Sequence, residues 1–221
     1  MTTKSAAAPD ISADSDTATA PVIHLVMGSN TGMSGRPITS GLTSNVDIYS
    51  LDSLDLGSVR GVIINGNCDQ IFLERKRDIL IDFVTSGGRI AVMGHPLTDF
   101  LPGLGQWRKF ESSGPKDLAI HAGTPHPVWA GVDTADLSFR REVSGFYGRG
   151  YSQKLPEGAI VTNFIGRHLL PVDYVYPLGA GEVLVHGGID LAVYQDDPNT
   201  SSRVFGQLLN WLARLDGKDN R

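Results

Sequence analysis

The pattern of hydrophobic and polar positions in residues 60–95 predicts a strand, a turn, a helix, a glycine pair and a second strand. A short β-branched run at 61–64 predicts a buried strand, and a cluster of turn-forming residues follows it. Residues 72–84 place apolar side chains at helical spacing with charged residues between them, which predicts an amphipathic helix. Two glycines then end the helix, and the run at 90–93 predicts a second buried strand. A strand, a helix and a strand in this order predict two parallel strands joined by a crossover.

The rest of the chain supplies further strands and one long amphipathic helix. Apolar or alternating runs predict strands at residues 22–27, 46–49, 118–120, 137–139, 145–147, 159–164, 172–176 and 182–186. Residues 201–215 carry an apolar stripe, which predicts a helix that packs on the sheet. Together these elements predict an α/β domain over residues 21–215 with a mostly parallel central sheet. Residues 1–20 are rich in Ala, Ser, Thr and Asp, so we expect a disordered tail there, and residues 216–221 form a short C-terminal tail.

Composition narrows the class of protein. The chain has 221 residues, 41% of them hydrophobic, which is enough for one domain with a full core. A net charge of −5 argues against a nucleic-acid partner and against an anionic membrane surface. The single cysteine excludes an internal disulfide and a cysteine metal cluster, and no apolar run is long enough to span a bilayer. We therefore expect a cytoplasmic protein with a small-molecule or protein partner, and the sequence leaves a homo-oligomer open.

Four segments in a fixed order carry a family resemblance. They are the strand–helix–strand unit at 61–94, the aromatic residues Trp107 and Phe110, residues 126–147, and residues 179–212. The third segment holds His126-Pro127-Val128, Gly131-Val132, Phe139, Glu142 and Phe146-Tyr147, and the fourth holds Gly179-Ala180-Gly181-Glu182-Val183-Leu184-Val185 and Leu209-Asn210-Trp211-Leu212. In this order the chain resembles the class I glutamine amidotransferase-like superfamily, and within it the ThuA-like branch of the trehalose-utilisation type.

The resemblance implies a three-layer, flavodoxin-like fold and a catalytic arrangement. In amidotransferases of this superfamily, a cysteine stands on a strained turn after the strand that ends the unit described above. A histidine and a glutamate near the last strand activate it. Here the nucleophile position falls on Gly94, or on His95 if the alignment shifts by one residue. His186 matches the histidine, but Gly188 stands at the glutamate position, and Asp190 is the nearest carboxylate. The resemblance therefore implies that glutamine hydrolysis by the family mechanism is lost.

Two histidines and two carboxylates are the candidates for other chemistry. His95 and His186 lie at the ends of two strands that would face a common crevice, where a histidine pair could serve acid–base chemistry or hold a divalent metal. Asp190 could orient such a pair, and Glu142 matches an acidic position of the family before an aromatic pair. Each has an ordinary structural alternative: polar lining of a cleft for the histidines, and a salt bridge to a neighbouring arginine for Glu142. His24 lies inside a strand, which favours a core histidine.

Cys68 is the only thiol and lies on a turn between a strand and a helix. Helix N-terminal amides could lower the pKa of the thiol there and favour the thiolate. However, Cys68 stands one strand–helix unit before the family's nucleophile, and Asp69 next to it opposes a negative charge. The alternative is an inert turn cysteine.

Loops at the carboxyl edge of the sheet define a predicted ligand pocket. Its expected members are Gly28, Asn30, Asn65, Gly66, Asn67 and Gly94. The leading hypothesis is a non-catalytic binding or assembly domain with a degenerate triad. The alternatives are a ThuA-like enzyme acting on a sugar or sugar derivative, with metal assistance through His95 and His186 as an option, and a cysteine hydrolase built on Cys68. No cofactor is predicted, and a carbohydrate-like ligand follows from the branch resemblance alone.

Overall fold

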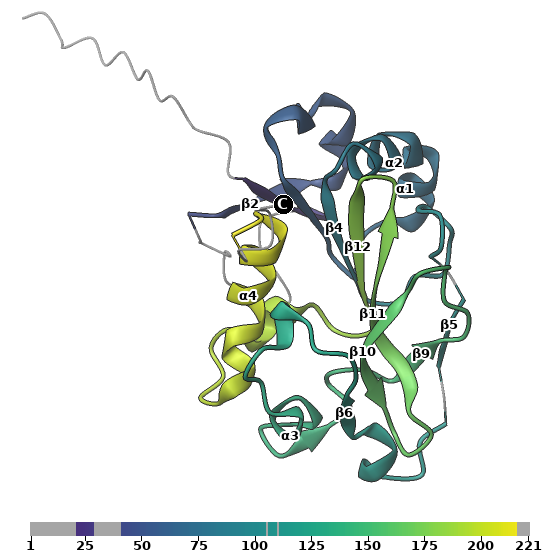
Figure 1. Cartoon of the computed structure of the whole chain (residues 1–221), viewed down its shortest axis with the longest axis vertical. Helices are drawn as coiled ribbons and strands as arrows, with labels where there is room; N and C mark the ends of the chain where they lie inside the picture. The colour runs from purple at the N-terminus through teal and green to yellow at the C-terminus, as the bar shows by residue number, and fades with distance from the viewer. Residues whose placement is uncertain (1–20, 29–40, 105, 110, 216–221) are drawn as a thin grey trace, which may run out of the picture.

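The computed structural model describes residues 21–28, 41–104, 106–109 and 111–215 of the chain (Figure 1). The two predicted tails, residues 1–20 and 216–221, and the predicted pocket residue Asn30 lie outside these ranges.

The centre of the molecule is an eight-stranded sheet with the strand order β2-β1-β3-β4-β12-β11-β10-β6. The first five strands of that order run parallel, while β11, β10 and β6 pair antiparallel along one side. The prediction of an α/β fold with a mostly parallel central sheet is therefore confirmed. The strands are β1 (Val22–Val26), β2 (Thr43–Asp47), β3 (Gly61–Ile64), β4 (Arg89–Met93), β6 (Ile120–Ala122), β10 (Ile160–Ile165), β11 (Leu170–Leu178) and β12 (Gly181–His186).

Two small antiparallel sheets of two strands each and several helices complete the described part of the chain. The small sheets pair β5 (Trp107–Lys109) with β9 (Gly150–Ser152), and β7 (Phe139–Arg140) with β8 (Val143–Ser144). The α-helices are α1 (Gln70–Arg75), α2 (Arg77–Thr85), α3 (Thr134–Ser138) and α4 (Arg203–Leu212). The 3₁₀ turns are η1 (Ile48–Ser53), η2 (Leu56–Ser58), η3 (Pro115–Leu118), η4 (Pro127–Trp129), η5 (Leu191–Tyr194) and η6 (Thr200–Ser202).

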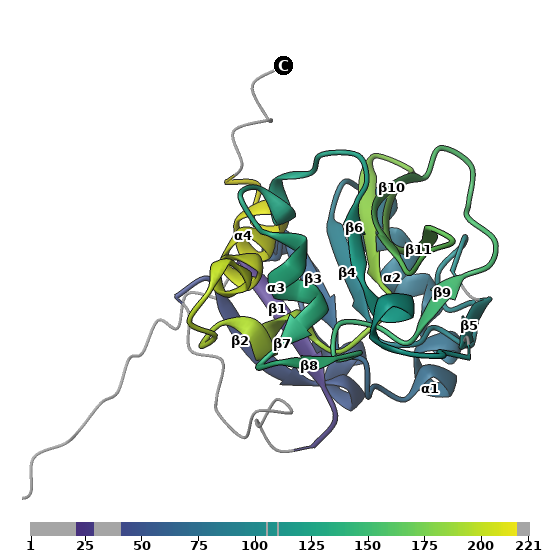
Figure 2. The same cartoon turned by 90° about the horizontal axis from the view of Figure 1, so that it is seen from below.

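Helices α2 and α4 cover opposite sides of the sheet (Figures 1 and 2). Alternate residues of the buried strands face the two sides, so Ile63 joins the core under α4, whereas Val62 and Ile64 join the core under α2. Leu80 of α2 and Leu208 of α4 are both fully buried against the sheet. Burial of a side chain of this size contributes about 1.5–3 kcal/mol, so each helix is held mainly by its apolar stripe.

The predicted parallel pairing at the centre of the sheet is confirmed. Strand β4 lies between β3 and β12 and pairs parallel with both, with Met93 opposite His186 in the β4–β12 pair. The carboxyl ends of β3, β4 and β12 therefore meet at one edge of the sheet. This edge is where ligands of open α/β sheets usually bind.

The predicted helix over residues 72–84 is interrupted. Lys76 separates α1 from α2 with φ −108° and ψ 14°, which lies outside the α-helical region. Its ammonium group pairs with Asp52 of the neighbouring η1 segment at 2.6 Å. The pattern gave no sign of the break, because no glycine or proline marks it.

Several other predicted boundaries were wrong. The strand predicted at 46–49 ends at Asp47, where that residue caps η1 with its side chain. Residues 137–139 belong mostly to helix α3, and residues 145–147 form no strand. The short strand near 118–120 begins only at Ile120. These segments are short, so contacts with the rest of the fold outweigh their local preference.

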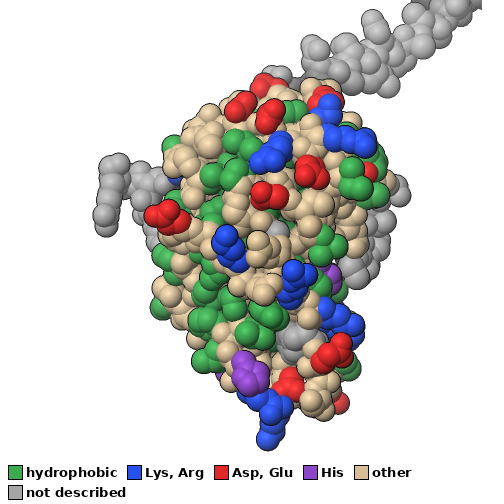
Figure 3. Space-filling model, turned by 90° about the vertical axis from the view of Figure 1, so that its right-hand side faces the viewer, with side chains coloured by type: hydrophobic (Ala, Val, Ile, Leu, Met, Phe, Trp, Pro, Cys, Tyr) green, Lys and Arg blue, Asp and Glu red, His purple; other side chains and the backbone are tan. Residues whose placement is uncertain are grey.

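No helix in the described ranges is long and apolar enough to cross a bilayer. The face of the molecule shown in Figure 3 carries positive and negative side chains interspersed with hydrophobic ones, and its basic residues form no single extended patch.

Candidate functional site

The loops after β3, β4 and β12 enclose a hollow of about 350 Å³ at the carboxyl edge of the sheet. The segment from Gly145 to Arg149 forms part of its wall. Of the predicted pocket residues, four line the hollow, whereas Gly28 does not belong to its lining. The lining residues are Asn65, Gly66, Asn67, Gly94, His95, Gly145, Phe146, Gly148, Arg149, Gly188, Ile189 and Asp190.

Two glycines bring the loops after β3 and β4 into direct backbone contact. Gly94 has φ +87°, a conformation that side-chain-bearing residues rarely adopt. A Cβ atom at position 94 would lie 2.5 Å from the Cα atom of Gly66, and a Cβ atom at position 66 would lie 2.9 Å from the Cα atom of Gly94. Gly94, the first of the two positions that the resemblance offers for the nucleophile, therefore has no room for a side chain, and the second position holds the imidazole of His95 in place of a thiol.

The position that the resemblance assigns to the glutamate is closed as well. A Cβ atom on Gly188 would overlap the carbonyl oxygen of Tyr147. Gly148 and Gly188 form a β-bridge at this point, so the two backbones are held against each other. A carboxylate could return at position 188 only if this contact opened.

His186 finds its carboxylate on the neighbouring strand, and the prediction that Asp190 orients it is wrong. The Nδ1 atom of His186 lies 2.6 Å from Oδ1 of Asp173, the residue directly opposite it on β11. Both side chains are completely buried. Within the described residues, Nε2 of His186 has no hydrogen-bond partner, and it lies 2.8 Å from where a Cβ atom on Gly188 would stand.

Asp173 is the centre of a larger buried network. Its Oδ2 atom accepts hydrogen bonds from the hydroxyl of Tyr147 and, at 2.8 Å, from Nδ2 of Asn163 on β10. The Tyr147 hydroxyl in turn accepts a hydrogen bond from Nε1 of Trp129 at 2.9 Å. Burial and the negative charge of Asp173 raise the pKa of Tyr147 well above its usual value. The network joins β10, β11 and β12 behind the hollow.

Asp190 faces the hollow and belongs to a second, separate network. Its Oδ2 atom accepts hydrogen bonds from Nε2 of His24 at 3.0 Å and from Nδ2 of Asn65 at 2.7 Å, while Oδ1 accepts from the amide of Ala192 at 2.9 Å. Burial alone would raise the pKa of Asp190, but the hydrogen bond and charge of His24 outweigh it and hold this pKa below the usual value. The prediction that His24 is a core histidine is confirmed, but it is satisfied only at Nε2, because its buried Nδ1 atom has no hydrogen-bond partner among the described residues.

His95 lies at the exposed rim of the hollow. Its ring stacks on Trp107 with 3.8 Å between ring centroids and 22° between ring planes, and Nε1 of Trp107 donates to the carbonyl of Gly187 at 3.2 Å. Partial burial, and to a smaller extent the charge of His186, lower the pKa of His95. His95 and His186 are thus neighbours across β4 and β12, as the sequence predicts, but only His95 reaches the hollow.

The donor set for a metal is incomplete in the described ranges. They contain no group of three or more histidine, cysteine, aspartate or glutamate side chains arranged to hold a metal ion. Protein zinc sites use at least three such ligands, and His186 already directs Nδ1 to Asp173. The metal option would therefore need ligands other than His95 and His186.

Cys68 is buried on the turn after β3. Its thiol donates to the carbonyl of Leu25 at 3.3 Å, and burial raises the pKa of the thiol to about 12. The first amides of α1 are taken by the side chain of Asp69, which accepts from Ile71 and Phe72. The predicted lowering of the pKa by helix amides is thus absent, because Asp69 occupies them.

Glu142 lies away from the hollow, at the tip of the β7–β8 hairpin. It and Arg141 form the two-residue turn, with φ +66° and +50° respectively. The side chain of Glu142 is exposed, whereas Arg140 and Arg141 pair with Asp197 at 2.6 Å and 3.5 Å. The structural alternative for Glu142 was a salt bridge to Arg140, Arg141 or Arg149. In the described residues the first two pair with Asp197, and Arg149 donates to the carbonyl of Gly145.

Sequence reasoning missed Asp173, Asn163 and Arg149. One feature of the sequence could have pointed to Asp173: it lies in a predicted buried strand, where a carboxylate needs a hydrogen-bond or charge partner. Its partner, His186, is fixed only by the antiparallel register of β11 and β12.

Comparisons with known proteins give fold neighbours. No protein-family model matches the chain, and no curated protein matches it. Among solved structures, Cytoplasmic Protein STM3548 from Salmonella typhimurium has a TM-score of 0.53 and 13% identity, over 77% of this chain and 80% of that one. Cytoplasmic Protein STM1381 from Salmonella typhimurium LT2 has a TM-score of 0.52 and 12% identity, over 77% and 81%. A beta-galactosidase from Rahnella sp. R3 matches 87% of this chain but 31% of its own, with 12% identity and a TM-score of 0.47, which is too low to carry an argument. At these identities, the likeness to the two Salmonella proteins shows the fold alone.

Proposed function

We propose that this chain is a non-catalytic domain of the class I glutamine amidotransferase-like superfamily, near its ThuA-like branch, that binds a ligand in the hollow at the carboxyl edge. The order β2-β1-β3-β4-β12 of the parallel strands supports the flavodoxin-like, three-layer form of this proposal. The Salmonella fold neighbours are named cytoplasmic proteins, and we propose the same location here.

The packing of Gly94 and Gly188 carries the proposal. Loss of a nucleophile by substitution alone would leave space where the side chain stood. Here the backbone of Gly66 fills the first position and the backbone of Tyr147 fills the second. The remaining histidine is sealed from the hollow and held by Asp173. This arrangement favours a binding surface over a catalytic one.

The lining of the hollow suits a small, hydroxyl-rich ligand. Asn67 and Arg149 present exposed polar side chains, Asn65 and Asp190 present polar groups at the floor, and the glycines expose backbone amides and carbonyls. Phe146 is 42% exposed at the wall and offers an apolar face. Sugars are bound by this combination of planar polar groups and an aromatic ring. A carbohydrate-like molecule is therefore the proposed ligand, and a protein partner or a second copy of the chain is the alternative.

A titration followed by NMR tests this function. Isotope-labelled protein is titrated with glucose, galactose and trehalose. We expect the amide signals of Gly66, Asn67, Gly94 and Gly188 to move while the sugar stays chemically unchanged. Asn67→Ala should weaken the response, and Asp82→Asn on the opposite edge should not. If no sugar moves these signals, the carbohydrate form of the proposal fails, and sedimentation velocity then tests the assembly form.

The His186–Asp173 pair supports a second candidate, a ThuA-like enzyme acting on a sugar derivative. A carboxylate that holds Nδ1 of a histidine leaves Nε2 available for acid–base work, which is the geometry of many catalytic histidines. For this function the Gly148–Gly188 contact would have to open. Product formation from a sugar panel that disappears in a folded His186→Gln variant would favour the enzyme over the binding domain.

A further inference from the structure

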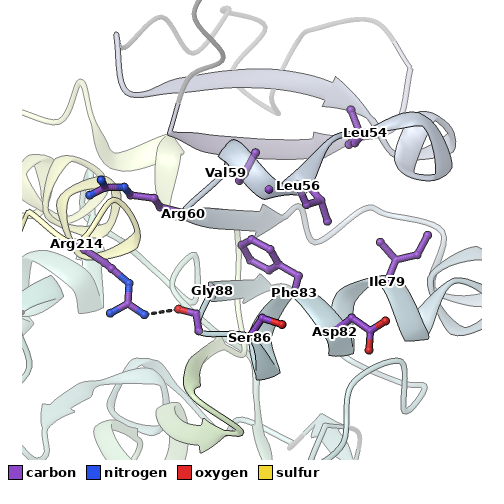
Figure 4. Close-up of a pocket in the computed structure, with 12 residues that line it drawn as sticks. Leu54, Leu56, Val59, Arg60, Ile79, Asp82, Phe83, Ser86, Gly88 and Arg214 are labelled. Carbon is purple, nitrogen blue, oxygen red and sulfur yellow. Dashed lines mark hydrogen bonds between the residues drawn. The ribbon is translucent and has the colours of Figure 1, made fainter.

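A second hollow lies at the opposite, amino edge of the sheet, and the proposed function makes no use of it. It encloses about 650 Å³ between the η1–η2 segment and helix α2 (Figure 4). Arg60 stands just before β3 and Gly88 just before β4, which places this hollow at the strand ends far from Gly94. Its volume is in the range of small-molecule sites.

The floor and one wall of this hollow are apolar. Phe83 is the largest side chain there, and its ring occupies the space over Gly88, where a Cβ atom would overlap the ring. Four aliphatic side chains from residues 54–59 and from α2 surround it, namely Leu54, Leu56, Val59 and Ile79. Leu54, Leu56 and Ile79 remain partly exposed, so the apolar surface is open to a ligand.

The charges at the two ends of the hollow differ in sign. Figure 4 shows Arg60 and Arg214 together at one end and Asp82 with Ile79 at the other. Arg214 donates to the carbonyl of Gly87, which fixes its guanidinium at the rim. The exposed guanidinium of Arg60 makes no hydrogen bond or ion pair with a described residue. An anionic group is therefore attracted to the arginine end and repelled from the Asp82 end.

We propose that this hollow binds an amphipathic carboxylate, with the aliphatic chain over Phe83 and the head group at Arg60 and Arg214. Guanidinium groups hold carboxylates with two parallel hydrogen bonds, and each methylene buried on the apolar floor strengthens binding by about fourfold. The charge difference along the hollow fixes the direction of the ligand. The site is independent of the hollow at the carboxyl edge.

Calorimetric titration of the full chain with decanoate, below the concentration at which it forms micelles, tests the proposal. We expect saturable binding that is roughly fifteenfold tighter than that of octanoate, which is two methylenes shorter, and tighter than that of decanol, which lacks the charge. Acetate should not bind. Arg60→Gln should weaken decanoate binding by about fivefold to tenfold, while Arg149→Gln, the matched substitution at the other hollow, leaves it unchanged.

A second variant separates the apolar contribution from the charge. Leu56→Ser should weaken decanoate and decanol alike, with thermal melting confirming that each variant is folded. The proposal would be overturned if decanol and decanoate bound equally well. It would also be overturned if Arg149→Gln weakened decanoate binding and Arg60→Gln did not. A third result would also overturn the proposal: decanoate does not bind, and sedimentation velocity shows a dimer that Leu56→Ser dissociates. A second copy of the chain would then cover the hollow.

Discussion

The two buried histidine–aspartate pairs differ in what surrounds the carboxylate. Asp173 lies in the middle of the sheet, shares no surface with solvent, and is held by His186, Tyr147 and Asn163. Asp190 lines the hollow and is held by His24, among others. The same pair of residue types thus fastens strands together in one place and shapes a pocket wall in the other. The difference shows that a histidine beside a carboxylate is no sign of catalysis until its access to the ligand is known.

Replacing Asp173 and Asp190 in turn by alanine should give the largest losses in the free energy of unfolding. Asp173→Ala leaves His186 and Tyr147 buried without their acceptor, and we expect a loss of about 3–5 kcal/mol in the free energy of unfolding. Asp190→Ala should cost about 1–3 kcal/mol, because water in the hollow can reach the donors it leaves. Urea denaturation of both variants measures the difference. A larger loss in Asp190→Ala than in Asp173→Ala would contradict the distinction between the pairs.

The backbone contact between Gly188 and Tyr147, close to His186, predicts the next largest loss of stability. Gly188→Ala should lower the free energy of unfolding by about 3 kcal/mol, because the new methyl group meets the Tyr147 carbonyl. Gly206→Ala is the matched control: it stands in α4 with open space around it, and alanine should stabilise the helix by about 0.5–1 kcal/mol. A tolerated Gly188→Ala would mean that position 188 can still carry a side chain.

The second pair makes a prediction about pH. The pKa of Asp190 is lower in the folded chain than in the unfolded chain, so its ionised form stabilises the fold. That stabilisation is fully present above the unfolded value of about 4 and is lost as the pH falls through the folded pKa. The stability difference between the natural chain and Asp190→Asn should therefore stay constant above about pH 4 and shrink as the pH falls below that value. Chemical denaturation at several pH values measures it, and a difference that grows on acidification would contradict the assignment.

Substitution of Cys68 should give the smallest loss of stability of these variants. With a pKa of about 12, the native thiol is almost wholly protonated at pH 8, and it should react with iodoacetamide roughly a thousandfold more slowly than in the unfolded chain. Cys68→Ala should lower the free energy of unfolding by about 1 kcal/mol and leave sugar binding unchanged. Rapid labelling of the native protein would revive the cysteine-hydrolase hypothesis.

The sequence predicts the centre of the fold well, because buried parallel strands leave continuous apolar runs between clear turn signals. The neighbourhood of β4 and β12 and the glycine turn at Gly94 follow from those runs. The antiparallel side of the sheet is harder to predict from the sequence, because the register of its strands depends on contacts between distant segments. The Asp173–His186 pair follows from that register, so it could not be predicted either. The role of Glu142 rests on the resemblance alone, and the residue stands in the exposed turn of the β7–β8 hairpin, outside the lining of the hollow.

Ammonia release from glutamine is the most direct test of the central claim that the catalytic positions are closed. The purified full chain is incubated with glutamine beside His186→Ala and Cys68→Ala, with each variant shown to be folded. We predict that all three release ammonia at the rate of a buffer blank. Release above the blank by the natural chain that either variant abolishes would contradict the account.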